Sequence, residues 1–115
     1  MKKILFAVPL LAFCLTGCVP LQHSAVLDVR SAEEYSTGHL QDAILIPVEE
    51  IPGRIAEIEP DKKTPLSVYC RSGRRSANAA AQLRRMGYEN VTDCGGIRDA
   101  AKRLNLPIVQ EKGEQ

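Results

Sequence analysis

The stretch Val68-Tyr69-Cys70-Arg71-Ser72-Gly73-Arg74-Arg75-Ser76 decides the fold of this chain. The apolar residues before Cys70 predict a buried strand, the Gly- and Arg-rich segment predicts a tight turn, and the Ala-rich segment after it predicts a helix. A cysteine at such a junction faces backbone N–H groups and the positive end of the helix dipole, which favour the thiolate. That environment lowers a cysteine pKa and makes the sulfur a nucleophile. The alternative is a buried Cys followed by a solvated basic turn.

Positive charge is concentrated beside this cysteine, at Arg71, Arg74 and Arg75. These guanidinium groups support a thiolate and attract an anionic substrate. The whole chain has 15 Lys and Arg against 14 Asp and Glu, a formal net charge of +1. Such a balance indicates no nucleic-acid partner. The sequence therefore predicts a small anionic ligand at the loop.

The first 17 residues have the pattern of an export signal. Lys2 and Lys3 precede an apolar stretch at residues 4–15 that is too short to span a bilayer. The stretch closes with Leu15-Thr16-Gly17-Cys18, which resembles the bacterial lipobox. This resemblance implies cleavage before Cys18 and acylation of Cys18, with acyl chains such as palmitate holding the protein on a membrane. An ordinary cleaved signal with an incidental Cys18 is the alternative.

The remaining chain divides into a tether at residues 18–24, one domain at 25–110 and a disordered tail at 111–115. We expect a monomer in the cell envelope, on the periplasmic face and on the outer rather than the inner membrane if the cell has two. Apolar runs predict strands at 25–29, 43–46 and 66–69, and a fourth strand is expected at 90–94, ending at Gly95-Gly96. Helical patterns predict helices after Ser31, at 48–59, at 76–86 and from 97 to 104. This alternation predicts an α/β fold with a parallel sheet covered on both faces.

Cysteine spacing indicates neither a metal site nor a cofactor site. Cys14 leaves with the signal, so Cys70 and Cys94 remain as thiols. They form no C-x-x-C pair, and His23 and His39 are scattered elsewhere. Cys94 ends the strand after the Cys70 helix, and parallel strands share one carboxyl edge. The hypothesis is that Cys94 forms a disulfide with Cys70 or acts as a resolving thiol for it; the alternative is a small buried apolar residue.

Several motifs in order resemble the rhodanese family of sulfurtransferases. The Cys70 loop resembles the family signature C-R-x-G-x-R-[ST], and residues 43–47 resemble the strand after its first motif. The other matching segments are Asp28-Val29-Arg30, Glu34-Tyr35, Gly38-His39-Leu40, Gly87-Tyr88 and Gly95-Gly96. Together they extend from Asp28 to about Leu104 and imply a minimal rhodanese-like three-layer fold, with a short parallel sheet and helices on both faces.

The chain departs from the family pattern at three places. Gln41-Asp42 replaces the usual Pro-Gly, an aromatic residue typical of the last helix is missing near Ala100, and the strand and helix that normally precede the Asp-Val-Arg strand are replaced by the tether. We therefore expect a shortened sheet with a less protected edge.

The resemblance implies a two-step sulfur transfer through Cys70. The thiolate takes the outer sulfur of a donor such as thiosulfate, and a thiol or cyanide then removes it. Family members that use mercaptopyruvate tend to have a small or apolar residue after the Cys, so Arg71 favours thiosulfate. The substrate-binding residues are expected in the loop: Arg71, Ser72, Gly73, Arg74, Arg75 and Ser76.

Other polar residues of the motifs are interpreted as structural. Asp28 and Arg30 are expected to tie the loop after the first strand, and His39 belongs to a motif with an architectural role in the family. Ser72 is expected to be a loop hydroxyl and Ser76 a helix cap.

Two other functions remain open. A cysteine phosphatase or arsenate reductase uses the same thiolate but needs Cys-x5-Arg, and here the sixth position after Cys70 is Ser76, while Arg75 gives Cys-x4-Arg. The second is a rhodanese fold used as a non-catalytic sulfur carrier or redox-partner module.

Overall fold

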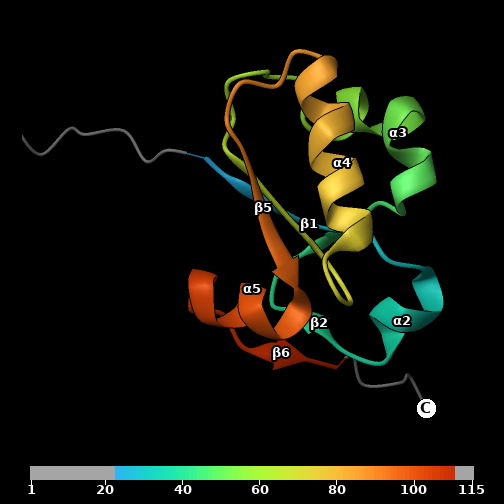
Figure 1. Ribbon diagram of the computed structural model, residues 1–115, viewed down its shortest axis with the longest axis vertical. Coiled ribbons are helices and arrows are strands. Elements are labelled where there is room, and N and C mark those ends of the chain that lie inside the picture. Colours follow the sequence, from blue (N-terminus) through green and yellow to red (C-terminus); the bar gives the residue numbers. More distant parts are fainter. Residues whose placement is uncertain (1–22, 111–115) are drawn as a thin grey trace, which may run out of the picture.

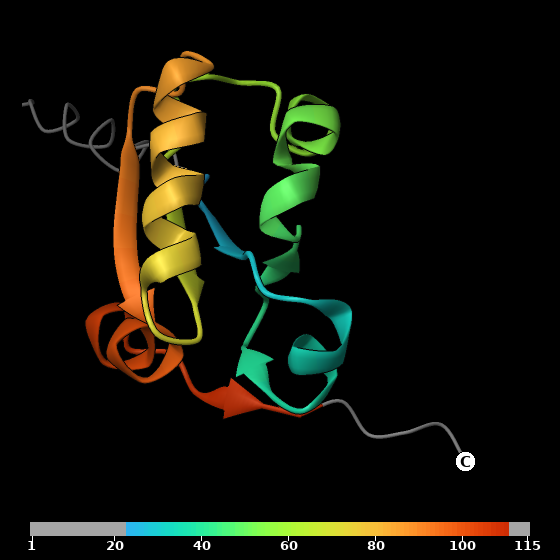
Figure 2. The same cartoon turned by 45° about the vertical axis from the view of Figure 1, so that its right-hand side comes forward.

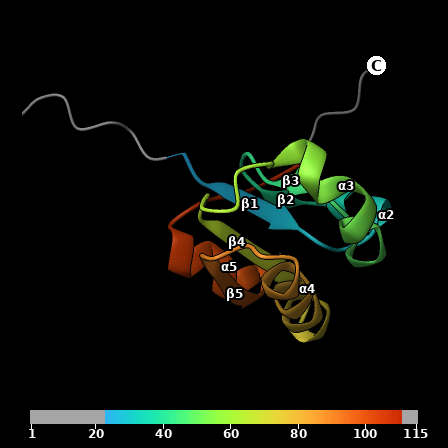
Figure 3. The same cartoon turned by 90° about the horizontal axis from the view of Figure 1, so that it is seen from above.

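The computed structural model describes residues 23–110, and its centre is a sheet of four parallel strands. In spatial order these are β3 (Ile44–Leu45), β1 (Ala25–Asp28), β4 (Leu66–Cys70) and β5 (Val91–Gly96). Figure 3 shows β1, β4 and β5 in this order across the molecule. The predicted parallel sheet with helices on both faces is therefore confirmed.

Two helices cover one face of the sheet. They are α3 (Ile51–Ile58) and α4 (Arg74–Arg85), which lie side by side in Figure 1. Alanines at the inner face of α4 let the helix approach the strands closely, and Ala79 and Ala80 are both buried. The core on this face consists chiefly of Leu27, Val29, Ile46, Ile51, Ile55, Leu66, Val68, Cys70, Leu83 and Tyr88.

The opposite face is covered by α5 (Ile97–Leu104) and by a small antiparallel ribbon. The ribbon pairs β2 (His39–Leu40) with β6 (Ile108–Val109), which lie together at the lower end of the molecule in Figure 2. A second buried cluster fills this side, formed by Leu40, Ala43, Tyr69, Cys94 and Ala100.

The helix after the first strand is α2 (Ala32–Ser36), and its start agrees with the sequence prediction. The Ser31 hydroxyl accepts from the Glu34 backbone N–H at 3.2 Å, while the Glu34 carboxylate accepts from the Ser31 backbone N–H at 3.0 Å. This reciprocal capping box fixes the direction in which the chain leaves β1.

Three element predictions need correction. The helix expected at 48–59 is a 3-10 turn, η1 (Val48–Glu50), followed by α3, because Pro52 lacks the N–H that an uninterrupted α-helix would use. Helix α4 begins at Arg74 rather than at residue 76, and its N-cap is Gly73. The ribbon of β2 and β6 was not predicted, since each strand has only two residues.

Several sequence predictions fall outside the described residues: the signal at 1–17, Cys18, most of the tether and the tail at 111–115. Among residues 23–110, no helix is both long and apolar enough to cross a bilayer.

Candidate active site

Cys70 lies at the topological switch point of the sheet. The chain passes from β1 to β3 on one side and returns to β4 on the other, so the carboxyl ends of β1 and β4 are neighbours, with Asp28 opposite Tyr69. In open parallel sheets this position leaves a crevice that ligands occupy. Cys70 is the last residue of β4, and the loop to α4 begins directly after it.

Backbone amides surround the Cys70 sulfur. The Gly73 N–H donates to Sγ at 2.9 Å. Burial by itself would raise the pKa of the Cys70 thiol, but hydrogen bonds from the backbone and hydroxyl of Ser76 and from the backbones of Gly73 and Ser72 outweigh it. The net result is a Cys70 pKa below its ordinary value, as expected for a thiolate in a cradle of N–H donors.

The tight turn depends on two glycines. Gly73 has φ +108°, a backbone conformation that strains residues with a Cβ. Gly96, at the end of β5, would place a Cβ only 2.7 Å from the Arg71 carbonyl oxygen. The loop therefore lies directly on the end of the neighbouring strand, and no side chain fits between them.

Ser76 connects the loop to β5, and it is not the helix cap that the sequence suggested. Because α4 begins at Arg74, Ser76 lies inside the first turn, where it is completely buried. Its hydroxyl lies 3.1 Å from the Gly73 carbonyl oxygen and 2.7 Å from Asp93 Oδ1, and both are acceptors. The same Asp93 oxygen accepts from the Gly95 N–H at 3.0 Å.

Arg75 is held by Glu34. Its two terminal nitrogens donate to the two carboxylate oxygens at 2.8 and 3.0 Å. This pairing with Arg75 lowers the pKa of Glu34 to about 2. The expectation that Arg75 binds substrate is therefore not met in this geometry, because its hydrogen-bonding edge is already used to join α4 to α2.

A group of polar side chains has a structural role next to the site and consists of Asp28, Arg30 and His39. The Arg30 guanidinium donates to Asp28 at 2.6 Å and to the Gly38 carbonyl oxygen at 2.6 Å. Burial lowers the pKa of Arg30, but the Asp28 carboxylate outweighs it and leaves the pKa raised. His39 stacks on the Tyr35 ring with 3.7 Å between centroids and makes a 2.9 Å hydrogen bond to the Tyr35 carbonyl oxygen. Within residues 23–110, the hydrogen bonds of Arg30 and His39 go to groups other than Cys70.

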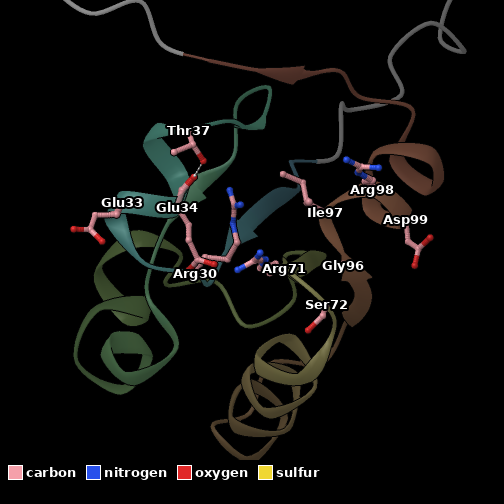
Figure 4. Close-up of a pocket in the computed structure, with 10 residues that line it drawn as sticks. All are labelled: Arg30, Glu33, Glu34, Thr37, Arg71, Ser72, Gly96, Ile97, Arg98 and Asp99. Atoms are coloured by element: carbon pink, nitrogen blue, oxygen red, sulfur yellow. Dashed lines mark hydrogen bonds between the residues drawn. The ribbon is translucent and has the colours of Figure 1, made fainter.

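A cleft of about 640 Å³ opens beside the loop. Figure 4 shows α2 residues on one side and the start of α5 on the other, with Arg71 between them. Arg71, Ser72 and Arg98 are exposed there, whereas Cys70 is only 1% exposed beneath the loop. Of the residues expected to bind substrate, Arg71 and Ser72 line the cleft, while Arg74 lies exposed on the first turn of α4 and does not line it.

The Cys94 side chain lies outside this site. Its side chain packs in the cluster beneath α5, while Cys70 packs in the cluster beneath α4, so the two side chains lie on opposite faces of the sheet. Both cysteines are free. Burial raises the pKa of Cys94 above its ordinary value. The shared carboxyl edge did not bring the two thiols together, because side chains alternate between faces along a strand.

Three features of the site were not predicted from the sequence. They are Glu34 as the partner of Arg75, Asp93 as the partner of Ser76, and Arg98 as a residue that lines the cleft. The Arg75–Glu34 pair joins residues far apart in sequence, so no local spacing could indicate it. Within residues 23–110, no group of three or more His, Cys, Asp or Glu side chains is placed to hold a metal ion.

Comparison with known proteins agrees with this geometry. The family model of the rhodanese-like domain matches residues 18–100. The thiosulfate sulfurtransferase PspE of Escherichia coli (strain K12) is 45% identical over 75 residues, which cover 65% of this chain and 72% of that protein. A sulfurtransferase of Allochromatium vinosum is 39% identical over 88 residues, covering 76% of this chain and 80% of that protein.

A solved structure is also similar. It is a rhodanese with anions from E. coli, with a TM-score of 0.70 and 41% sequence identity over 76% of this chain and 99% of that chain. Sequence motifs, sheet topology and the loop around Cys70 thus agree with the same assignment: the chain belongs to the rhodanese-like domain family and is a sulfurtransferase of the rhodanese type.

Proposed function

We propose that the chain transfers sulfane sulfur from thiosulfate to a thiol or to cyanide through a persulfide on Cys70. The observation that carries this proposal is the cradle at Cys70, where a backbone N–H donates to Sγ at 2.9 Å and the thiol pKa is lowered. The named activity of PspE supports thiosulfate as the donor.

In the first step, the Cys70 thiolate attacks the outer sulfur of thiosulfate. A bond forms between Sγ and that sulfur while the S–S bond of thiosulfate breaks, and sulfite leaves with the electron pair. The terminal sulfur of the persulfide then carries the negative charge. Fixed N–H donors stabilise such charge without having to reorganise. Exposed Arg71 at the mouth attracts the anionic donor and its sulfite product.

In the second step, an acceptor thiolate or cyanide attacks the terminal sulfur. The S–S bond of the persulfide breaks, and Cys70 leaves as a thiolate with the electron pair. The environment that lowers the Cys70 pKa makes this sulfur a better leaving group. Donation and release therefore use the same cradle.

A carrier function is the second candidate, and the burial of Cys70 supports it. A sulfur held beneath the loop at 1% exposure is protected from chance thiols and suits delivery to a docked partner. Purified protein mixed with thiosulfate and excess cyanide separates the two functions. The enzyme is expected to release many equivalents of thiocyanate per chain, a carrier only one, and the Cys70→Ser variant none. Release by Cys70→Ser at the wild-type rate would overturn both functions.

We also infer that Cys18 is lipidated and that the protein is anchored to the periplasmic face of a membrane. The pattern Leu15-Thr16-Gly17-Cys18 after an apolar stretch supports this inference. Expression of the full chain in a Gram-negative host with labelled palmitate tests it. Wild type is expected to carry label in the outer-membrane fraction, and Cys18→Ser is expected to carry none. An unlabelled wild-type protein would contradict the anchor.

A further inference from the structure

The hydroxyl of Ser76 has a single proton but several hydrogen-bond acceptors around it. It can donate one hydrogen bond. Its oxygen lies 2.7 Å from Asp93 Oδ1 and 3.1 Å from the Gly73 carbonyl oxygen. The same hydroxyl is also among the groups that lower the pKa of the Cys70 thiol. When Cys70 is a thiolate, its sulfur and the Asp93 carboxylate compete for the proton of this fully buried hydroxyl.

We propose that Asp93 is a positioning residue of the sulfur-transfer reaction, acting on Cys70 through the Ser76 hydroxyl, which turns between the carboxylate and the sulfur as the charge on the sulfur changes. This inference rests on the proposed role of Cys70 as nucleophile. It adds a residue from β5 to a site otherwise built from the loop and the first turn of α4. Asp93 touches neither substrate nor sulfur in this arrangement.

The turn of the hydroxyl follows the charge through both steps. While Sγ is a thiolate, the Ser76 O–H stabilises it. As Sγ bonds to the outer sulfur of the donor, its charge moves to the terminal sulfur, and the O–H returns to the Asp93 carboxylate. When the acceptor removes that sulfur, charge reappears on Sγ and the O–H turns back. No proton leaves the oxygen, so only the hydrogen bond changes partner.

The backbone keeps Asp93 in place for this role. Its Oδ1 accepts from the Gly95 N–H at 3.0 Å, and its own carbonyl oxygen accepts from Arg103 of α5 at 3.3 Å. The first contact fixes the carboxylate and the second fixes the backbone of Asp93 within β5. A carboxylate held there is a permanent competitor for the Ser76 proton.

Other charged groups near the sulfur are already paired or exposed. Arg75 of α4 interacts electrostatically with Cys70, but Glu34 of α2 holds its guanidinium. Asp28 of β1 is paired with Arg30. Arg71 in the loop and Asp99 of α5 are exposed. A change at Asp93 leaves all of them unaltered, so its effect on Cys70 is measured against a constant background.

Alkylation of Cys70 by iodoacetamide as a function of pH tests the proposal, in the full protein and without any sulfur donor. Asp93→Asn keeps an acceptor oxygen for Gly95 but removes the competing charge, so the alkylation midpoint is expected to fall by about one pH unit. Ser76→Ala is expected to raise the midpoint. Adding Asp93→Asn to Ser76→Ala is expected to produce no further shift.

Asp61→Asn is the matched control. Asp61 accepts from the Lys63 N–H at 2.9 Å in the turn before β4, at the opposite end of that strand from Cys70. The same loss of charge there is expected to leave the midpoint unchanged. An alkylation midpoint of Asp93→Asn equal to that of wild type would overturn the proposal. The proposal would also be overturned if Asp93→Asn shifted the midpoint by the same amount in the Ser76→Ala background as in wild type.

A measurement on wild-type protein covers the case in which Asp93→Asn does not fold. The ¹³C resonance of the Asp93 carboxylate is expected to move as Cys70 ionises and to move back when thiosulfate loads the sulfur. A resonance that stays unchanged both when Cys70 ionises and when thiosulfate loads the sulfur contradicts the proposal. Because alkylation needs no sulfur donor, a protein that shows the shifts but takes up no sulfur would overturn the proposed function, and only the coupling of Asp93 to Cys70 through Ser76 would remain.

Discussion

Cys70 and Cys94 are each 1% exposed, yet their chemistry is opposite. The Cys70 pKa is lowered, whereas burial raises that of Cys94. The difference comes from the donors around each sulfur. Cys70 ends its strand, where the amides of a loop and a helix start converge, while Cys94 is a strand residue beneath α5. Burial alone makes a thiol inert, and converging N–H groups reverse that effect.

The largest expected effect is a difference in labelling between the two thiols. At pH 7, a thiol reagent is expected to modify Cys70 much faster than Cys94, since the lowered pKa of Cys70 increases its thiolate fraction and the raised pKa of Cys94 decreases its own. Peptide mass spectrometry after timed labelling of the folded protein measures both rates. Equal rates in the folded state would remove the contrast between the two sites.

The next effect concerns the close approach of the loop to β5. Gly96→Ala would bring a Cβ to 2.7 Å from the Arg71 carbonyl oxygen and displace the loop. We expect thiocyanate formation from thiosulfate and cyanide to fall about 100-fold, the size of effect found when one donor to a developing charge is lost. Gly53→Ala is the matched control, because a Cβ there has no neighbour within 4 Å. A fully active Gly96→Ala variant would show that the loop tolerates displacement.

A smaller effect on stability is expected at the ion pair between α2 and α4. Glu34→Gln keeps a side chain suited to the capping box but loses the charge that pairs with Arg75. We expect the free energy of unfolding to fall by about 1 kcal/mol at neutral pH. Urea denaturation of this variant and of Glu33→Gln, a change of the same charge at an exposed neighbour in α2, measures the difference.

The stability difference also has a defined pH dependence. The folded-state pKa of Glu34 is depressed to about 2 from an ordinary value of 4.5, so the pair stabilises the fold above pH 4.5. Its contribution is lost as the pH falls from about 4.5 toward 2. A difference between wild type and Glu34→Gln that stays constant across this range would contradict the assignment.

The smallest effect is expected at Cys94. Cys94→Ala removes a buried sulfur from the α5 side and is expected to lower the free energy of unfolding by about 1 kcal/mol. Sulfur transfer is expected to remain within twofold of wild type, since Cys70 lies on the other face of the sheet. Thermal unfolding together with the thiocyanate assay checks both expectations. Loss of sulfur transfer in a folded Cys94→Ala protein would instead support a role of Cys94 as a resolving thiol.

The central part of the fold could be predicted because its signals are local. Strands β1 and β4 come from short, mostly apolar runs, and the capping box at Ser31 and Glu34 needs only residues three apart. The place of Cys70 between β4 and α4 follows from one continuous stretch of sequence. These features depend on neighbours along the chain, and the sequence displays them directly.

The errors arose where distant segments meet. Arg75 was interpreted from its neighbours in the loop, and only the fold brings Glu34 to it. Cys94 was placed by strand order, but one residue of register decides which face a side chain occupies. Ser76 was expected to begin a helix that starts two residues earlier, because Gly73 at φ +108° serves as the cap.

The pairing of β2 with β6 has a consequence for biosynthesis. His39 and Leu40 find their partner strand only in residues 108–109, so the ribbon cannot form until nearly the whole domain has been translated. Closing the ribbon joins segments from nearly opposite ends of the described residues, which carries the loop-closure entropy of a long chain segment. We therefore expect this pairing to form late in folding of the domain.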